Sequence, residues 1–185
     1  QIITNPSGQL LISDEANHTI STFNTDGEYV KRWGIEGSGT GEFRGPAGIS
    51  FTPDGNLIVV DALNNRIQEY TEDGEFVKQF GSHGDNPGEF DNPWGVHVDE
   101  NGDIYVADWG NDRVQVFSSE GELKIVIEGE TPDGLSIQKP TSVAVDKHGD
   151  IYLTDWGNNR VLLYNQEGKY VWRFLGDASL SRVAR

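Results

Sequence analysis

Short apolar runs alternate with turn residues along this chain. Between residues 46 and 80 the runs are 47–51, 57–60, 66–70 and 76–80, and they contain mainly Val, Ile, Tyr and Phe. Asp-Gly pairs and an Asn-Asn segment separate them. Runs this short between such turns predict antiparallel β-hairpins. Because no stretch keeps apolar residues at helical spacing over three turns, the sequence predicts an all-β protein.

The pattern recurs with a fixed period of 47 residues. One glycine series and one aspartate series show it: Gly8, Gly55, Gly102 and Gly149, and Asp14, Asp61, Asp108 and Asp155. A repeated unit of four short strands at this spacing is typical of a β-propeller blade. We therefore expect a single domain over residues 1–185, with four-stranded antiparallel blades at 1–33, 46–80, 93–127 and 140–174.

Three connectors of equal length, residues 34–45, 81–92 and 128–139, separate these blades. The first two contain Gly-Glu-Phe, and we interpret Phe43 and Phe90 as apolar plugs between neighbouring blades. In an up-and-down sheet, the middle turn of each blade and the connectors share one face, opposite the tight first and third turns. Because function on rigid scaffolds usually resides on such loops, this long-loop face is the candidate binding surface.

One motif runs through residues 46–70, 93–117 and 140–164. Its form is Pro-x-Gly-Val, then Asp-x-x-Gly-x-Ile-x-Val-x-Asp-x-x-Asn-x-Arg-Val, with substitutions at single positions. The motif resembles the NHL-repeat family of β-propellers, and the resemblance covers nearly the whole chain. Blade one departs from it, because His18 and Thr19 stand where the other blades have Asn or Asp and then Arg.

The resemblance implies a closed ring of about six blades, and this chain holds about four. We therefore expect a partial ring of a larger propeller, or a ring that another copy of the chain completes. Four blades closing alone is a third alternative. An open arc would expose two apolar blade faces, which favours self-association through the open blade edges.

The amino-acid composition limits the kinds of partner that the chain can bind. The chain has 14 Lys and Arg against 30 Asp and Glu, a net charge of −16. This balance argues against binding to nucleic acid, which needs clustered cations, and against adhesion to anionic membranes. With no cysteine the chain forms no disulfide and offers no thiolate chemistry. The sequence shows no bilayer-spanning apolar run and no signal peptide; a removed leader stays open, so no compartment is assigned.

The repeated Asp-x-x-Asn-x-Arg set surrounds the middle turn and contains Arg66, Arg113 and Arg160. In a structural role, the arginines would donate to carbonyl groups or to a carboxylate of the adjacent blade. In a binding role they would contact a ligand on the long-loop face. A motif repeated in every blade favours the structural role, and repetition also argues against catalysis.

Tryptophans are the more suggestive candidates. Trp109 and Trp156 each precede Gly in a middle turn, and Trp94 begins an innermost strand where it could line a central channel. A loop tryptophan can stack on a sugar or a cation or anchor a protein, and it can equally fill the wedge between blades. Both interpretations stay open. The candidate ligand-binding residues are Trp94, Trp109, Trp156, Arg66, Arg113, Arg160 and His97.

Histidines could indicate a metal, but no two of His18, His83, His97 and His148 share a repeat position. Three zinc ligands cannot be assembled from them, so no metal or cofactor is assigned, and His97 can be a buried imidazole. No catalytic set is evident. The sequence favours a non-catalytic scaffold that binds a protein, peptide or glycan. The alternative is a lyase or hydrolase, similar to amidating or lactone-processing propellers, with a metal near the channel.

Overall fold

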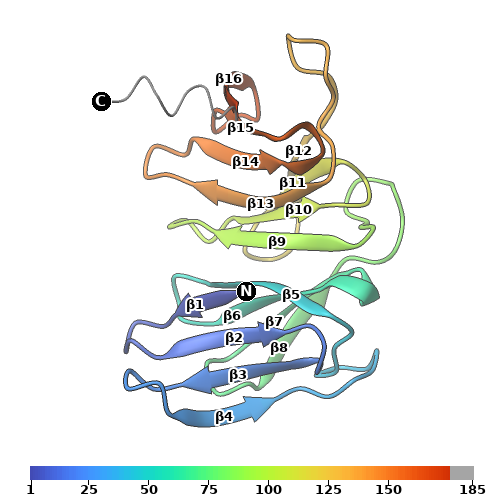
Figure 1. Cartoon of the computed structure of the whole chain (residues 1–185). Coiled ribbons are helices and arrows are strands. Elements are labelled where there is room, and N and C mark those ends of the chain that lie inside the picture. The colour runs from blue at the N-terminus through green and yellow to red at the C-terminus, as the bar shows by residue number, and fades with distance from the viewer. Residues whose placement is uncertain (176–185) are drawn as a thin grey trace.

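The computed structural model describes residues 1–175, which form four four-stranded antiparallel sheets (Figure 1). Each sheet is a blade whose strands follow one another in sequence order. Blade 1 comprises β1 (Ile2–Thr4), β2 (Leu10–Asp14), β3 (Thr19–Phe23) and β4 (Tyr29–Trp33), and blade 2 comprises β5 (Pro46–Phe51), β6 (Leu57–Asp61), β7 (Arg66–Tyr70) and β8 (Phe76–Phe80). Blade 3 comprises β9 (Pro93–Val98), β10 (Ile104–Asp108), β11 (Arg113–Phe117) and β12 (Leu123–Ile127), and blade 4 comprises β13 (Pro140–Val145), β14 (Ile151–Asp155), β15 (Arg160–Tyr164) and β16 (Tyr170–Leu175). The expected all-β propeller fold is confirmed.

Two short 3-10 helices, η1 (Ala62–Asn64) and η2 (Trp156–Asn158), form the middle turns of blades 2 and 4. Neither these nor any other helix in the part of the chain that the structure describes is long and apolar enough to cross a membrane.

The innermost strands approach one another closely. Strand β9 packs against both β5 and β13. A Cβ atom at Gly48 would lie 2.6 Å from the carbonyl oxygen of Trp94, and one at Gly95 would lie 2.6 Å from that of Thr141. Such separations are shorter than side-chain contacts allow, so glycine at these positions lets neighbouring blades converge toward a common centre.

The apolar core lies between adjacent blades. Every residue of β6, β7, β10 and β11 is buried, because both faces of blades 2 and 3 are covered. Phe43 and Phe90 are fully buried; the ring of Phe43 lies 5.7 Å from that of Trp33 and 5.5 Å from that of Tyr70. Their interpretation as apolar plugs is confirmed, and Ile137 takes the equivalent buried place in the third connector.

The last residue of each middle turn has a left-handed backbone, and in blades 1 to 3 its side chain links the blade to the next. These residues adopt positive φ angles between 51° and 57°: His18, Asn65, Asp112 and Asn159. His18 Nδ1 accepts from the Gly45 amide at 3.0 Å, and Asn65 Oδ1 accepts from the Asn92 amide at 2.7 Å. Asp112 Oδ1 accepts from the Lys139 amide at 2.8 Å. Each of these three turns therefore fixes the start of the following innermost strand.

His18→Asn tests this link. Asn keeps an acceptor and tolerates the left-handed conformation, so we expect the free energy of unfolding to stay within about 0.5 kcal/mol of the native value or to rise. His18→Val removes the acceptor and places a β-branched residue at positive φ, so we expect a loss of about 2–3 kcal/mol. Urea unfolding of both variants measures the difference. Equal stability of the two variants would contradict the link.

Candidate functional site

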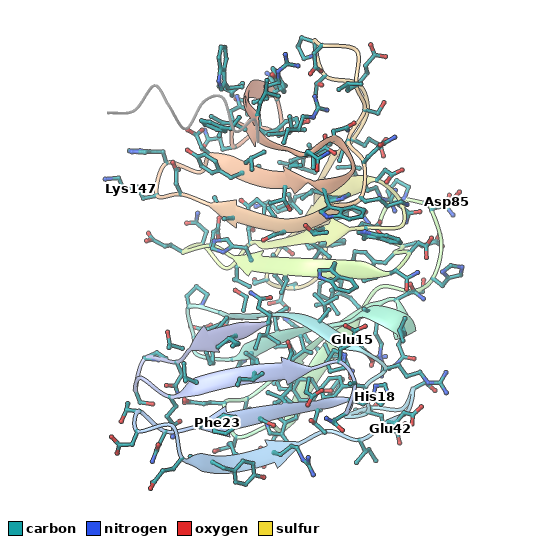
Figure 2. The ribbon with its side chains drawn as sticks, viewed as in Figure 1. Glu15, His18, Phe23, Glu42, Asp85 and Lys147 are labelled. Atoms are coloured by element: carbon teal, nitrogen blue, oxygen red, sulfur yellow. The ribbon has the colours of Figure 1, made fainter. Side chains whose placement is uncertain are left out.

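The middle turns and the starts of the innermost strands form one rim, which we call the loop rim. The register pairs Pro46 with Asp61, Pro93 with Asp108 and Pro140 with Asp155, so each innermost strand begins beside the end of its neighbour. Figure 2 shows Glu15, His18, Glu42 and Asp85 on the right of the view and Lys147, from a first turn, on the left. The long loops therefore gather on one face, as expected.

A buried carboxylate organises the rim in each of blades 2 to 4. In blade 3, Oδ2 of the fully buried Asp108 accepts from Arg113 Nε at 2.8 Å, Asn111 Nδ2 at 2.9 Å and Gln115 Nε2 at 3.1 Å. Its Oδ1 accepts from the Asp91 amide at 2.9 Å. Burial raises the pKa of Asp108, and the hydrogen bonds from Asn111 and Arg113 oppose that rise.

The arginines of this network hold the connectors. Arg113 donates to the carbonyl oxygens of Asp85, Asn86 and Glu89 at 2.8–2.9 Å. Arg66 makes the same contacts with the carbonyl oxygens of Ser38, Gly39 and Glu42. In blade 4 the pattern changes: Arg160 donates to Thr131 Oγ1, to the carboxylate of Asp133 and to the carbonyl oxygen of Leu135.

All three arginines are buried, and their guanidinium groups bond inward to a connector and to an aspartate. Such charge-assisted bonds with several carbonyl groups order a loop that has little regular structure of its own. These contacts are those of the structural role, in which the side chains make the rim rigid and do not themselves point out of it.

The tryptophans differ from one another. Trp156 is 64% exposed and Trp94 is 42% exposed. Trp109 is half-buried, with the Nζ atom of Lys139 4.5 Å from its ring centroid. Lys139 immediately precedes β13, the first strand of blade 4. The cation at the start of blade 4 therefore covers the middle turn of blade 3. Sequence reasoning missed Lys139, although its place just before Pro140 puts it at the rim.

A cavity of about 420 Å³ opens at the centre of the rim. Residues from all four blades line it, among them Ser13, Ala47, Trp94 and Thr141, together with the carboxylate-bearing Glu15. Trp94 is one of the residues that line this cavity. The aromatic ring, the hydroxyl groups and the carboxylate could bind a ligand that has both an apolar face and hydrogen-bond donors.

His97 does not join this group. It faces a separate pocket of about 370 Å³ between the first turns of blades 3 and 4, with Asp99 and Asp146. Burial lowers the pKa of its imidazole, and the ring lies 6.5 Å from that of Tyr105. Trp94 lies near the opposite end of β9, so His97 and the tryptophans belong to different faces. Among residues 1–175, no three His, Asp or Glu side chains are grouped as metal ligands.

Family comparisons match the two halves of the chain. Residues 90–117 and 138–163 match the NHL repeat, and residues 2–71 match a 6-bladed beta-propeller family. The chain is an NHL-repeat β-propeller protein. A search of curated proteins finds no match to this propeller.

Solved structures share the propeller fold at low sequence identity. Virginiamycin B lyase from Staphylococcus aureus superposes with a TM-score of 0.72 at 18% identity, over 94% of this propeller and 54% of the lyase. Hydrazine synthase from Kuenenia stuttgartiensis gives 0.70 at 18% identity, over 93% and 47%. A gluconolactonase from Xanthomonas campestris gives 0.58 at 18% identity, over 89% and 52%. The propeller described here spans about half the length of these structures.

Proposed function

We propose that this chain is a non-catalytic scaffold that binds a protein, peptide or glycan at the loop rim. The exposure of Trp156 and Trp94 on the face that carries the long loops supports this proposal. Large exposed aromatic side chains on a rigid surface anchor partners, because they bury much apolar area with little loss of conformational freedom. The buried arginines make the loop rim rigid, and we do not expect them to contact the ligand.

The net charge of the chain indicates which kinds of partner are chemically compatible with the rim. With a net charge of −16, the chain attracts cationic segments and repels polyanions. The cavity beside Trp94 also contains Glu15, which would pair with a lysine or arginine or accept from a sugar hydroxyl. A neutral glycan or a basic peptide therefore fits this rim better than an acidic ligand.

The test is binding of the native chain to peptide and glycan arrays, compared with the double variant Trp94→Ala, Trp156→Ala. We expect ligands of the native chain to lose at least about tenfold in affinity, since two aromatic anchors each contribute more than about 1 kcal/mol. Phe76→Ala, an exposed aromatic on the outer strand β8, is the matched control and should bind as the native chain does. Unchanged affinity in the double variant would remove the tryptophans from the proposal.

The alternative function is a lyase or hydrolase with its site in the central cavity. The shape shared with virginiamycin B lyase and the gluconolactonase supports it at the level of fold alone. Zinc, magnesium and calcium titrated into the purified chain by calorimetry would test for the metal this alternative requires. Stoichiometric binding that Glu15→Gln abolishes would favour a metal in the channel over the scaffold.

A further inference from the structure

A smaller cavity, of about 250 Å³, lies at the interface of blades 1 and 2, and we call it the interface cavity. Blade 1 contributes Gln9, Thr22 and Lys31 to its lining, and the third turn of blade 2 contributes Glu72 and Asp73. The turns that join β1 to β2 and β3 to β4 lie on the left of Figure 1, opposite the middle turns. The interface cavity is therefore on the face of tight turns, away from the loop rim, and two adjacent blades form its walls.

The hydroxyl group of Thr22 is a buried polar group in the wall of this cavity. Thr22 lies in β3 and is 2% exposed, and its Oγ1 atom has no hydrogen-bond partner among residues 1–175. Gln9 adds a second donor, because its Oε1 atom accepts from Asn5 Nδ2 at 3.0 Å and its Nε2 atom remains to donate. Buried polar groups in native proteins almost always have a partner, so Thr22 is a candidate contact for a ligand.

Lys31 adds a positive charge to the same wall. It lies directly opposite Thr22 in the register of β3 and β4. Its Nζ atom donates to the carbonyl oxygen of Glu72 at 3.1 Å and lies 3.5 Å from the carboxylate of Asp73. An ammonium group has three donors, so one donor of Lys31 remains for a further acceptor.

The interface of blades 2 and 3 repeats the contacts of this lysine. Lys78 lies 47 residues after Lys31, and its Nζ atom donates to the carbonyl oxygen of Ser119 at 2.6 Å. The same atom lies 3.5 Å from the carboxylate of Glu120. Ser119 and Glu120 hold the repeat positions of the two blade 2 residues that Lys31 contacts, so the two interfaces can be compared atom by atom.

The comparison shows a carboxylate at the place that concerns us. Glu69 holds the repeat position of Thr22 and is 8% exposed. Its Oε1 atom accepts from Asn56 Nδ2 at 2.7 Å, and its Oε2 atom lies 3.5 Å from Lys78 Nζ. Asn56 in turn holds the repeat position of Gln9. The amide and the ammonium group are thus present at both interfaces, whereas only the interface of blades 2 and 3 supplies a carboxylate between them.

The interface of blades 3 and 4 fills the same place with apolar side chains. Val116 and Ile125 pair in the register at the repeat positions of Thr22 and Lys31, and they pack in one apolar cluster. Two of the three interfaces therefore complete this place with their own side chains. At the interface of blades 1 and 2, the short side chain of Thr22 leaves the amide and the ammonium group beside a cavity.

We propose that the interface cavity binds a short-chain monocarboxylate, whose carboxylate takes the place that the Glu69 carboxylate occupies at the next interface. The hydroxyl, amide and ammonium donors of blade 1 bind its two oxygen atoms, and hydrogen bonds from a charged donor to a carboxylate are strong. Leu11 and Val30 also line the cavity and would contact the alkyl part of an acetate or propionate ion. The site lies on the face opposite the loop rim, so it is independent of the ligand proposed there.

Neighbouring charges make this binding weak. Glu72 and Asp73 add two carboxylates to the lining, and the whole chain has a net charge of −16. Both side chains are exposed, so solvent and salt screen them, and the carboxylate of Glu72 already accepts from Asn5 Nδ2 at 2.5 Å. We expect a dissociation constant on the order of 10 mM for acetate. At about 0.1 M acetate the folding equilibrium constant should then rise about tenfold.

Urea unfolding in sodium acetate, with sodium chloride added to keep the ionic strength constant, measures this stabilisation. Thr22→Glu carries the carboxylate on the chain itself, as Glu69 does, so it should be more stable than the native chain in chloride and should not respond to acetate. Thr22→Val keeps the shape of the side chain and removes its donor, so it should bind acetate at least about threefold more weakly. Thr25→Glu, at an exposed threonine of the neighbouring turn, is the control and should respond as the native chain does.

Glu69→Thr gives the decisive comparison. This variant copies the arrangement of blade 1 into blade 2, because it leaves Asn56 and Lys78 without the carboxylate that they contact. It should be less stable than the native chain in chloride, and acetate should stabilise it more than it stabilises the native chain, since two sites then bind the ion. Propionate should act as acetate does at both sites.

Amide NMR of the native chain during an acetate titration locates the site without any variant. The shifts should concentrate in β3, in β4 and in residues 71–74. Three results would overturn the proposal: acetate that stabilises the native chain no more than chloride does, shifts that lie outside these segments, and a folded Thr22→Glu variant that keeps the native response. If Thr22→Glu does not fold, the titration and Thr22→Val decide, and an undiminished response in Thr22→Val would count against the site.

Discussion

Replacing Arg113 by Met should lower the free energy of unfolding by about 3–5 kcal/mol, the largest effect expected of a single polar substitution here. The change leaves the fully buried Asp108 carboxylate without its cation and removes the donors to three connector carbonyl groups. A domain of this size is stable by about 5–15 kcal/mol, so the variant should be near its folding limit. Urea unfolding followed by tryptophan fluorescence measures the loss.

The pH dependence separates this explanation from a simple loss of packing. Burial already raises the pKa of Asp108, and removing Arg113 should raise it further. A carboxyl group whose pKa is higher in the folded state than in the unfolded state weakens folding as the pH rises. The deficit of the variant should therefore be smallest near pH 4 and should grow toward pH 7. Arg44→Met, at an exposed arginine of the same rim, is the control; a similar loss there, or a pH-independent deficit, would contradict the mechanism.

Sequence periodicity was sufficient to predict the fold, because the residues that define a blade are local. Turn glycines such as Gly74 need positive φ, and an aspartate such as Asp108 ends each second strand, so both recur at 47-residue intervals. The alternation of turns also predicted which face carries the long loops. That inference needs only the up-and-down order of strands, and Figure 2 places Glu15 and Lys147 on opposite sides accordingly.

The candidate site was less predictable, because exposure depends on neighbours that are distant in sequence. Trp109 and Trp156 occupy the same position of the repeat, yet one lies beneath Lys139 and the other is open. The difference arises because Lys139, at the start of blade 4, covers the middle turn of blade 3. Among residues 1–175, no residue covers the middle turn of blade 4 in the same way. The path of an irregular connector likewise decides which carbonyl groups Arg113 meets, and no local pattern specifies that path.

The connectors contribute both to the stability of the fold and to the proposed binding face. Arg66 and Arg113 draw residues 34–45 and 81–92 onto their blades, and the same segments lead into the innermost strands that line the central cavity. Side chains at the rim therefore stand on loops whose backbone is held by buried charge. A rigid support lowers the conformational entropy lost when a ligand binds, which favours affinity at Trp94.

Phe90→Ala should lower the free energy of unfolding by about 3–5 kcal/mol, because it opens a cavity between blades 2 and 3. Phe90 is fully buried, its ring lies 5.6 Å from that of Phe117, and it belongs to the cluster that includes Ile67 and Val106. Phe90→Ile should cost less than half as much, since the smaller Ile137 fills the same place in the next connector. Urea unfolding of both variants, with Phe76→Ala as an exposed control, measures the series.

The part of the structure that Phe90→Ala destabilises is as informative as the size of the loss in stability. Among residues 1–175 the main contacts between blades join adjacent blades, so a cavity at Phe90 should weaken the interface of blades 2 and 3 before that of blades 3 and 4. Amide hydrogen exchange should therefore quicken most in β6 and β10, whose residues face the cluster of Phe90, and least in β15. Uniformly faster exchange in all four blades would instead show that the sheets unfold as one unit, and that Phe90 stabilises the whole arc and not a single joint.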